Sequence, residues 1–341
     1  MKLTQRALAL ITAAISVPAT AALAPAAAAS ASPARSRSPA VNAVPRVTAT
    51  IPVGVQPDHV AVNPRTDRIY VANDGSRTVS VINGSTKKVT ATISGFGTLG
   101  GIAVNPRTNR IYVSDFNSTS ELADTAVISG QTNKVTATVP AGSNSSPVAV
   151  DPATNRIYVF AAGGLAVISG QTNKVTATIN LGPNGGSDAA VNPRTNRIYV
   201  ATGENGGLSV ISGRTDTLIT TIFVSDTETP GVAVDPRTNR IYLSDVNERI
   251  FAFSGQTNKV LGALPGGSGG DEVAVNPLTN RIYEAVGLGV NGPVTVDDGS
   301  TGQLVATIPV GNEPMDVAVD PLTNTAYVTN LRDNTVSVIT G

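Results

Sequence analysis

From about residue 46 onward, short runs of alternating apolar and polar residues follow one another, with turn residues between them. In the first complete unit these runs cover residues 60–62, 68–72, 79–82 and 88–93. A period of two and an enrichment in Val, Ile, Thr and Tyr predict β-strands, here named a, b, c and d. Asn63-Pro64 before strand b and Asn83-Gly84 before strand d are typical of tight turns. The pattern therefore predicts four antiparallel strands in each unit.

The unit is repeated seven times, and each copy carries one tyrosine at the same position. The tyrosines are Tyr70, Tyr112, Tyr158, Tyr199, Tyr242, Tyr283 and Tyr327, at intervals of 42, 46, 41, 43, 41 and 44 residues. Seven units of this length, each with four short strands, predict an all-β fold, a seven-bladed β-propeller. One unit is too small to bury its own faces, so we expect the tyrosine rings to pack between neighbouring blades.

The two ends of the repeat region predict how the ring closes. The last unit supplies strands a, b and c but stops at Gly341 without a strand d. An additional strand, Val47–Val53, precedes the first unit, and its sequence matches strand d elsewhere, for example residues 305–310. We therefore expect residues 47–53 to complete the last blade.

The residues that follow each tyrosine resemble a known repeat family. The last unit contains Tyr327-Val328-Thr329-Asn330, and residues 70–73, 112–115 and 242–245 are variants of it. This phrase is similar to the repeat of the YVTN-type β-propeller family, and the likeness covers roughly residues 46–341. The resemblance implies a seven-bladed propeller outside the cytoplasm. It does not imply one activity, because related propellers include cell-surface proteins, lactonases and streptogramin lyases.

The N-terminus has the features of a secretory signal peptide. Lys2 and Arg6 precede an apolar stretch that ends near Leu23, and small residues that suit cleavage follow it. A membrane anchor is the alternative, but the stretch is short and contains several polar residues, so we expect no transmembrane span. The predicted organisation is a signal peptide at residues 1–29, a flexible Ala/Ser/Pro-rich tether at 30–45 and the propeller at 46–341.

Composition excludes several classes of site. The chain of 341 residues has no cysteine and one histidine, so it has no disulfides, thiolate metal sites or histidine clusters. Its formal net charge is zero, which gives no bulk attraction to nucleic acid or membrane and makes a nucleic-acid partner a weak possibility. Low aromatic content argues against a platform for stacking bases or sugars. We expect the protein to be a monomer.

Candidate binding residues emerge when the units are compared at the entrance to strand a, near the expected channel. This position holds His59, Gly101, Pro147, Asp188, Gly231, Glu272 and Asp316 in the seven units, and Asp58 and Asp271 precede two of them. Four units therefore place an ionisable group near the channel mouth. The predicted ligand-binding residues are Asp58, His59, Asp188, Asp271, Glu272 and Asp316; no catalytic residue is assigned.

Three interpretations of these residues remain open. Asp188, Glu272 and Asp316 are predicted metal ligands, because carboxylate oxygens suit a hard cation such as Ca²⁺ or Mg²⁺. Alternatively, crowding of like charges would raise the pKa of one carboxylate enough for general acid–base catalysis. The simplest interpretation is that these side chains cap turns or face water.

The predicted charges differ between the two faces of the ring. The turn face, made by the a–b and c–d turns, carries many more basic than acidic residues, with Asp297 counted among the acids. The loop face, made by the b–c and d–a loops, is strongly acidic. The turn face could contact an anionic envelope polymer, and the loop face an unknown ligand or protein. Alternatively, these charges recur because the turns recur, and they pair locally.

Two functions are consistent with these features. The first is a secreted, non-enzymatic binding or scaffold propeller of the cell envelope. The second is a lactonase-like hydrolase or lyase that holds a divalent cation at the channel mouth, with His59 as acid or base. Because no catalytic constellation is visible, we favour the first.

Overall fold

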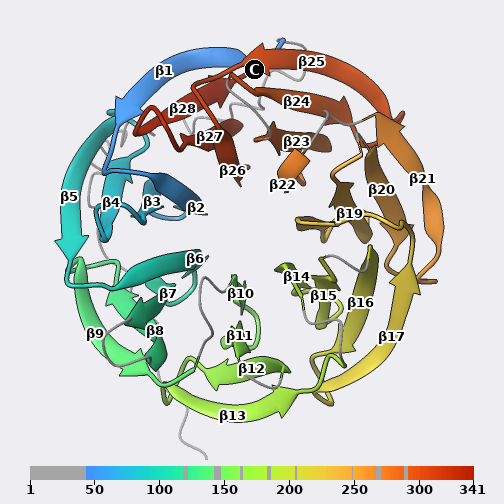
Figure 1. The fold of residues 1–341 in the computed structure, drawn as a ribbon, viewed down its shortest axis with the longest axis horizontal. Helices are drawn as coiled ribbons and strands as arrows, with labels where there is room; N and C mark the ends of the chain where they lie inside the picture. The colour runs from blue at the N-terminus through green and yellow to red at the C-terminus, as the bar shows by residue number, and fades with distance from the viewer. Residues whose placement is uncertain are drawn as a thin grey trace, which may run out of the picture. The chain divides into compact units, whose positions relative to one another are not determined.

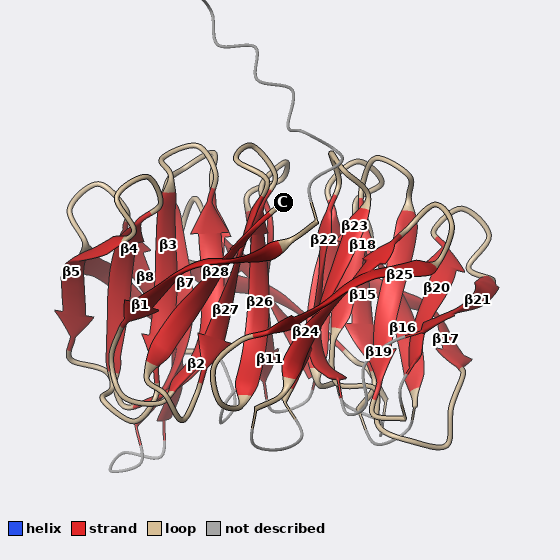
Figure 2. Cartoon of the chain, turned by 90° about the horizontal axis from the view of Figure 1, so that it is seen from above, coloured by secondary structure: helices blue, strands red, loops and turns tan. Residues whose placement is uncertain are grey.

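The computed structural model describes residues 44–117, 122–141, 147–161, 164–182, 186–203, 206–247, 249–265, 270–287 and 291–341. Within these residues, 28 strands form seven sheets of four antiparallel strands arranged in a ring, and no helix occurs (Figures 1 and 2). The prediction of an all-β, seven-bladed propeller is confirmed. Each blade runs outward from strand a at the centre to strand d at the rim.

The strands follow the repeat of the sequence. Blades 1 and 2 comprise β2 (Pro57–Asn63), β3 (Arg68–Asn73), β4 (Thr78–Asn83), β5 (Lys88–Ser94), and β6 (Thr98–Asn105), β7 (Arg110–Asn117), β8 (Leu122–Ser129), β9 (Lys134–Val139). Blades 3 and 4 comprise β10 (Val148–Asp151), β11 (Arg156–Ala161), β12 (Gly164–Ser169), β13 (Lys174–Ile179), and β14 (Asp188–Asn192), β15 (Arg197–Ala201), β16 (Gly207–Ser212), β17 (Thr217–Phe223). Blades 5 and 6 comprise β18 (Val232–Asp235), β19 (Arg240–Asp245), β20 (Arg249–Ser254), β21 (Val260–Pro265), and β22 (Gly270–Asn276), β23 (Arg281–Val286), β24 (Pro293–Asp298), β25 (Gln303–Pro309). Blade 7 comprises β26 (Pro314–Asp320), β27 (Thr325–Asn330), β28 (Thr335–Thr340) and β1 (Arg46–Pro52).

The ring closes as the sequence predicts. Strand β1 is the outer strand of blade 7 and pairs antiparallel with β28, from Arg46 opposite Thr340 to Pro52 opposite Thr335. Ile51 of β1 is buried and joins a core cluster that also contains residues of blade 1. The first and last strands of the ring are therefore held in one sheet, and β28 is not left as an open edge.

The predicted signal peptide and most of the predicted tether, residues 1–43, lie outside the described residues. Their prediction is not tested by the structure. Among the residues that are described, no helix is long and apolar enough to cross a membrane.

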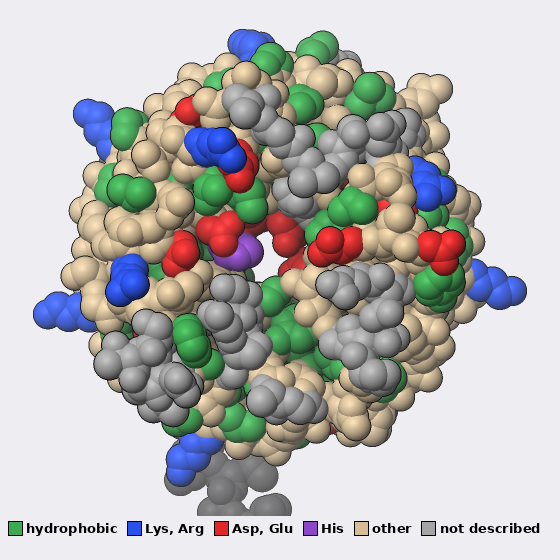
Figure 3. Space-filling model, in the orientation of Figure 1, with side chains coloured by type: hydrophobic (Ala, Val, Ile, Leu, Met, Phe, Trp, Pro, Cys, Tyr) green, Lys and Arg blue, Asp and Glu red, His purple; other side chains and the backbone are tan. Residues whose placement is uncertain are grey.

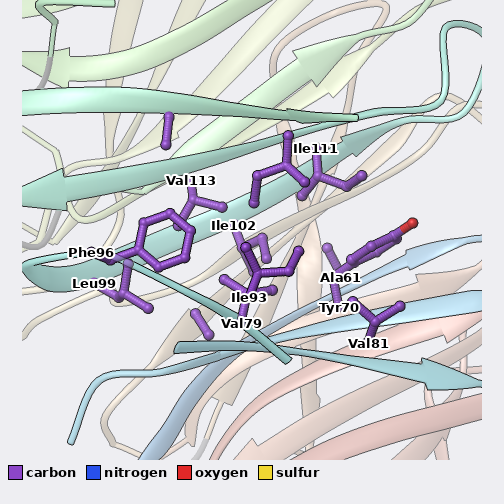
Figure 4. Close-up of a cluster of buried hydrophobic side chains, with 13 residues drawn as sticks. Ala61, Tyr70, Val79, Val81, Ile93, Phe96, Leu99, Ile102, Ile111 and Val113 are labelled. Atoms are coloured by element: carbon purple, nitrogen blue, oxygen red, sulfur yellow. The ribbon is translucent and has the colours of Figure 1, made fainter. Parts of the chain in front are cut away.

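The tyrosines occupy the core between blades. All seven are at most 2% exposed. Tyr70 of blade 1 lies in one cluster with Ile111 and Ile128 of blade 2, and the same Tyr–Ile arrangement recurs around the ring (Figure 4). Burying one large apolar side chain stabilises the fold by about 1.5–3 kcal/mol. Most of this burial comes from the contact between blades, so no blade is expected to be stable alone.

The a–b turn explains why asparagine recurs in the repeat. The Asn63 side chain accepts a hydrogen bond from the Arg65 N–H at 3.1 Å, which closes the turn on its own backbone. Four residues after Asn63, Asp67 adopts a left-handed conformation with φ of 52°. The other blades have Asn109, Asn155, Asn196, Asn239, Asn280 and Asn324 there, with φ between 51° and 56°. Asn and Asp are the non-glycine residues that tolerate this region best.

A relay of asparagine side chains links neighbouring blades on the turn face. The Asn105 amide of blade 2 donates to Asn155 Oδ1 of blade 3 at 2.8 Å. Equivalent bonds run from Asn63 to Asn109, from Asn192 to Asn239 and from Asn276 to Asn324. Every donor in the relay is the turn asparagine of one blade, and every acceptor is the left-handed asparagine of the next.

The relay is interrupted where the donor is replaced by aspartate. Asp151 and Asp235 take the donor position in blades 3 and 5, and an ionised carboxylate cannot donate. The acceptors that would face them, Asn196 Oδ1 and Asn280 Oδ1, are buried and lack a hydrogen-bond partner among the described residues. The change from an amide to a carboxylate therefore explains why both buried acceptors lack a hydrogen bond.

The ring-closing interface uses charge instead of amides. The donor position of blade 7 is Asp320 and the acceptor position of blade 1 is Asp67. Burial raises the pKa of Asp320, and the nearby charge of Asp67 acts in the same direction. Hydrogen bonds from Leu322 and Thr323 act in the opposite direction. Lys87 lies near both carboxylates and donates to the Tyr327 hydroxyl at 3.1 Å. Lys87 has a left-handed φ of 56°, a conformation that is unfavourable for lysine, so the contacts of its ammonium group offset a backbone cost.

Arginines of strand b form a second set of links on the turn face. Arg110 Nη1 donates to the Gly170 carbonyl of the next blade at 2.7 Å. Arg156, Arg197 and Arg240 make the same bond to Gly213, Gly255 and Gly299. Much of the positive charge predicted for the turn face is thus bound within the ring. The anionic envelope polymer remains a prediction.

The prediction that Asp297 is one of the surface acids of the turn face is wrong. Asp297 of β24 is fully buried, so it adds no charge to that surface. It stands at a core position of strand c, where the other six blades have isoleucine or phenylalanine. The signal in the sequence is therefore an acid at a position that is apolar in every other blade.

Deleting residues 46–53 tests the closure of the ring. The deletion removes β1, exposes the edge of β28 and opens the cluster that contains Ile51, so we expect the melting temperature to fall by more than about 10 °C. The matched control deletes eight residues of the predicted tether, 34–41. Equal melting curves for the two deletions, measured by circular dichroism, would contradict the closure.

Exchanging Asp and Asn in the relay tests how much the relay contributes to the free energy of unfolding. Asp151→Asn supplies the missing donor to Asn196, while the exposed Thr154 that now bonds Asp151 can turn to water. We expect the free energy of unfolding to rise by about 1 kcal/mol. The reverse change, Asn105→Asp, should lower it by a similar amount. Chemical denaturation measures both, and changes of the same sign would rule out the relay.

Candidate functional site

The candidate site lies at the loop-face end of the central channel, where the innermost strands begin. His59, Asp188, Glu272 and Asp316 come from β2, β14, β22 and β26, in blades 1, 4, 6 and 7. All four line one cavity of about 160 Å³, together with Val60, Gly101, Ile102, Pro147 and Val148. Figure 3 shows acidic side chains and the histidine around the central opening. The repeat thus brings four titratable residues, far apart in sequence, to one mouth.

Irregular pairing at the strand starts helps to aim these side chains. The a–b register shifts between Pro57 and His59 in blade 1, and between Gly270 and Glu272 in blade 6. Blade 7 has a similar shift between Pro314 and Val317. A β-bulge changes the direction of the side chains beside it and is common next to functional sites. Three of the four titratable residues thus lie at a local departure from the regular ladder, and blade 2 has a similar shift between Leu99 and Ile102.

His59 lies between two carboxylates. Its Nε2 atom is 3.4 Å from Asp58 Oδ2, and its Nδ1 atom is 3.7 Å from Asp316 Oδ2. Burial lowers the pKa of His59, but the charge of Asp58 and the hydrogen bond and charge of Asp316 outweigh it and raise the pKa from 6.5 to about 9. His59 is therefore protonated at neutral pH. The interaction of protonated His59 with these carboxylates stabilises the folded protein. This contribution is fully present below about pH 6.5 and is lost as the pH rises through about 9.

Asp316 and Asp188 also join neighbouring blades. Asp316 Oδ2 of blade 7 accepts from the Val60 N–H of blade 1 at 2.8 Å, and Asp188 Oδ2 of blade 4 accepts from the Val232 N–H of blade 5 at 2.9 Å. The interpretation that these carboxylates cap the backbone therefore applies to both. The sequence showed their position in the repeat but not this backbone contact.

Asp188 has a perturbed pKa. Burial is the main cause and raises it from 3.8 to about 6, while the backbone N–H groups of Val232 and Ala189 act in the opposite direction. The nearby charge of Asp316 raises it further, and that of His59 lowers it. Asp188 is mostly ionised at neutral pH and becomes neutral in mildly acidic solution.

The remaining predicted residues are placed differently. Asp58 contacts His59 but is not among the residues that line the cavity. The side chain of Asp271 lies outside the described part of the chain. Gly231 of blade 5 does not line the cavity either. The mouth is thus acidic on the side of blades 4, 6, 7 and 1 and apolar on the side of blades 2 and 3.

The positions of the carboxylates bear on the predicted metal site. Asp188, Glu272 and Asp316 share the cavity. Among the described residues, however, no group of three or more histidine or acidic side chains is close enough together to hold a metal ion. The geometry therefore lends no support to Ca²⁺ or Mg²⁺ at the mouth, and the metal remains a prediction.

Comparison with known proteins identifies the fold. No protein-family model matches the sequence, and no curated protein matches it. The YVTN-type repeat therefore remains a resemblance. Among solved structures, a chain of Kuenenia stuttgartiensis hydrazine synthase is similar, with a TM-score of 0.75 and 17% identity, over 84% of this chain and 96% of that one. A likeness at this identity concerns the propeller fold alone.

The protonation of His59 can be measured directly, because it is the only histidine in the chain. In a two-dimensional NMR titration its imidazole signals should show a pKa near 9. Asp316→Asn retains an oxygen that can accept from Val60 but removes the charge, so the pKa should fall towards its ordinary value. A wild-type pKa at or below about 6.5, the value of an unperturbed histidine, would contradict this electrostatic description of the mouth.

Proposed function

We propose that the protein is a non-enzymatic binding propeller of the cell envelope, secreted from the cytoplasm, and that its channel mouth receives the cationic end of a ligand. The supporting observation is the set of residues around the cavity. Asp188, Glu272 and Asp316 line it, Asp58 lies beside His59, and His59 is the one basic side chain among the described residues that line the cavity.

The charge balance at the mouth favours a positively charged group. Three carboxylates and the His59 imidazolium line the cavity, Asp58 lies beside His59, and no lysine or arginine is among the described residues that line the cavity. A cleft lined by one sign of charge with low-dielectric walls focuses the field and attracts the opposite charge. Burial lowers the pKa of His59, but the negative charges outweigh it and raise the pKa, so His59 keeps its proton at neutral pH. A ligand ammonium or guanidinium group would be stabilised in the same way.

The size of the cavity limits what can enter. About 160 Å³ is well below the volume of pockets that enclose whole drug-sized ligands. The mouth suits the end of a chain, such as a primary amine or the tip of a lysine or arginine side chain. The rest of the ligand would lie across the loop face. A peptide, a polyamine or an amino-sugar polymer presents such groups.

The protonation of His59 bears on the alternative function. An imidazole with a pKa near 9 is already protonated at neutral pH, so His59 cannot serve as the general base of that alternative, although it could still donate a proton as an acid. A lactonase-like hydrolase or lyase would also require a divalent cation at the mouth. The described residues offer no group of three ligands for that ion. The lack of a neutral base and of a three-ligand ion site among the described residues favours binding over base-assisted, metal-dependent catalysis.

Secretion and location in the envelope rest on the sequence. The predicted signal peptide at residues 1–29 and the predicted tether at 30–45 would carry the propeller out of the cytoplasm and leave it free to rotate. The resemblance to YVTN-type repeats points to the same location. A function outside the cytoplasm also agrees with a ligand drawn from peptides or amino-sugar polymers.

A calorimetric titration with two short peptides tests the proposal. One peptide is rich in lysine, and in the other every lysine is replaced by glutamine. We expect only the first to bind at pH 7.5, and its affinity to fall at least about tenfold in Glu272→Gln and Asp188→Asn, which corresponds to about 1.4 kcal/mol. Glu313→Gln is the matched control, because Glu313 lies on the loop face outside this cavity and pairs with Arg332.

Three other results would contradict the proposal. Equal binding of the two peptides would remove the role of ligand charge. Unchanged affinity in both mouth variants would place the ligand elsewhere on the ring. Binding of Ca²⁺ or Mg²⁺ at the mouth, together with hydrolysis of a lactone, would favour the enzymatic alternative.

A further inference from the structure

Blade 6 carries two carboxylates in its core where the other blades have apolar residues. Glu284 of β23 stands at the position after the repeat tyrosine, which is valine or leucine in the other six blades. Asp297 of β24 stands at the isoleucine or phenylalanine position of strand c. Both residues are 0% exposed. Neither belongs to the channel mouth, so the proposed function does not explain them.

The two carboxylates lie on the same side of the sheet. Asp297 is paired with Ile282, and Glu284 with Thr295, and residues two apart on one strand face the same way. At the other interfaces, the residue equivalent to Asp297 packs in one cluster with the tyrosine of the preceding blade, as Ile128 does with Tyr70. The face that carries Asp297 and Glu284 is therefore the one against blade 5.

This interface contains the smallest of the buried clusters in the described part of the ring. Its buried members are seven residues, Ala233, Tyr242, Ile250, Ala252, Leu264, Val273 and Ile282, whereas the other clusters have between eight and thirteen. Asp297 occupies the place of the missing apolar side chain. The described core of this junction thus has a carboxylate where the other junctions have an apolar side chain.

The rim of the same interface is incompletely filled. A cavity of about 230 Å³ lies between the outer strand of blade 5 and the c–d turn of blade 6, and Tyr242, Ala252 and Leu264 line it. Gly262 replaces the alanine found at this position in several other blades, such as Ala91, which packs against its core cluster. A Cβ atom at Gly262 would meet no atom within 4 Å.

The hydrogen-bonding of the two carboxylates differs. Both oxygens of Asp297 are buried and have no hydrogen-bond partner among the described residues. Glu284 Oε2 accepts a bond from the Thr295 hydroxyl at 3.2 Å. An ionised carboxylate without partners in an apolar environment costs several kcal/mol, so it either takes up a proton or admits water.

The charged groups on the surrounding elements have other contacts. On blade 5, Arg240 donates to the Gly299 carbonyl, Arg249 pairs with Asp245, and Lys259 is exposed beside the c–d turn. Tyr242 is neutral, because burial raises its pKa. On blade 6, Arg281 of β23 pairs with Asp298 of β24, and Glu284 adds a further acid. The facing part of β25, residues 303 and 304, carries no titratable side chain.

We propose that the interface between blades 5 and 6 is a pH-sensitive seam in the ring, closed while Asp297 is neutral and loosened when Asp297 ionises. Ionisation places an unpartnered charge against the core cluster of this junction, three of whose members, Tyr242, Ala252 and Leu264, also line the cavity through which water can enter. Separation of the two blades hydrates the carboxylate. The seam, rather than the β1–β28 closure, is where the ring opens first in alkaline solution.

The direction of the pH dependence follows from the burial of Asp297. Burial raises its pKa from the ordinary value of 3.8 to about 7. The folded protein therefore holds a proton that the unfolded chain releases between these pH values. The contribution of Asp297 to stability is largest below about pH 4, falls as the pH rises to about 7 and is constant above that.

Thermal unfolding of the full-length chain between pH 4 and pH 8.5 tests the seam. Asp297→Ile restores the residue of the other blades, and Asp297→Asn keeps the shape but cannot ionise. We expect both variants to exceed the wild type in Tm by about 5 °C or more above pH 7.5, and this difference to shrink towards pH 4. Asp151→Asn, which removes a buried carboxylate from the interface of blades 3 and 4, is the control and should not reproduce this trend.

Hydrogen exchange locates the opening. At pH 8.5 the amides of β21 and β24 should exchange at least tenfold faster in the wild type than in Asp297→Asn, with exposure times scaled to the intrinsic amide rate. The amides of β1 and β28 should be equal in the two proteins. If the Tm difference between the wild type and Asp297→Asn is the same at every pH, or the faster exchange lies outside blades 5 and 6, the seam is contradicted.

Discussion

The packing of each blade on its two neighbours is the interaction on which the rest of this ring depends. A four-stranded blade exposes two faces and can cover neither by itself. The repeat tyrosine meets residues of strands b and c of the next blade, and these are isoleucines except at Phe253, Asp297 and Ala326. Since each blade is stabilised only by its neighbours, the ring has no natural end, and β1 must return to complete blade 7.

Polar groups on the turn face reinforce the same junctions. The asparagine relay and the arginine bonds to glycine carbonyls both run from one blade to the next. The relay depends on the amide nitrogen of its donor asparagine. Where Asp151 and Asp235 replace that asparagine, the facing acceptor has no donor among the described residues. The turn face is therefore used largely for assembly, whereas the strand starts on the loop face differ between blades and can carry a site.

The sequence predicts most of this architecture because the repeat is regular. Seven tyrosines in register determine the number of blades, and the missing strand d determines the closure. The same register places His59, Asp188, Glu272 and Asp316 at the starts of inner strands. It could not show that Asp188 and Asp316 bind the backbone of the next blade, because that contact joins residues 44 and 256 positions apart. The burial of Asp297 does not follow from its place beside the c–d turn, because it depends on the core position that it takes in strand c, where the other blades have isoleucine or phenylalanine.

The candidate site thus lies where blades depart from the repeat. The acidic mouth and the two carboxylates in blade 6 are the main departures, and the first is accessible to a ligand (Figure 3). A crystal structure of the full-length chain, grown at neutral pH with a short alkylammonium salt, tests the central claim most directly. We expect the ammonium group at the mouth, within hydrogen-bonding distance of Asp188, Glu272 or Asp316, with His59 still between Asp58 and Asp316. An ammonium bound elsewhere, or mouth carboxylates gathered around a divalent cation, would contradict it.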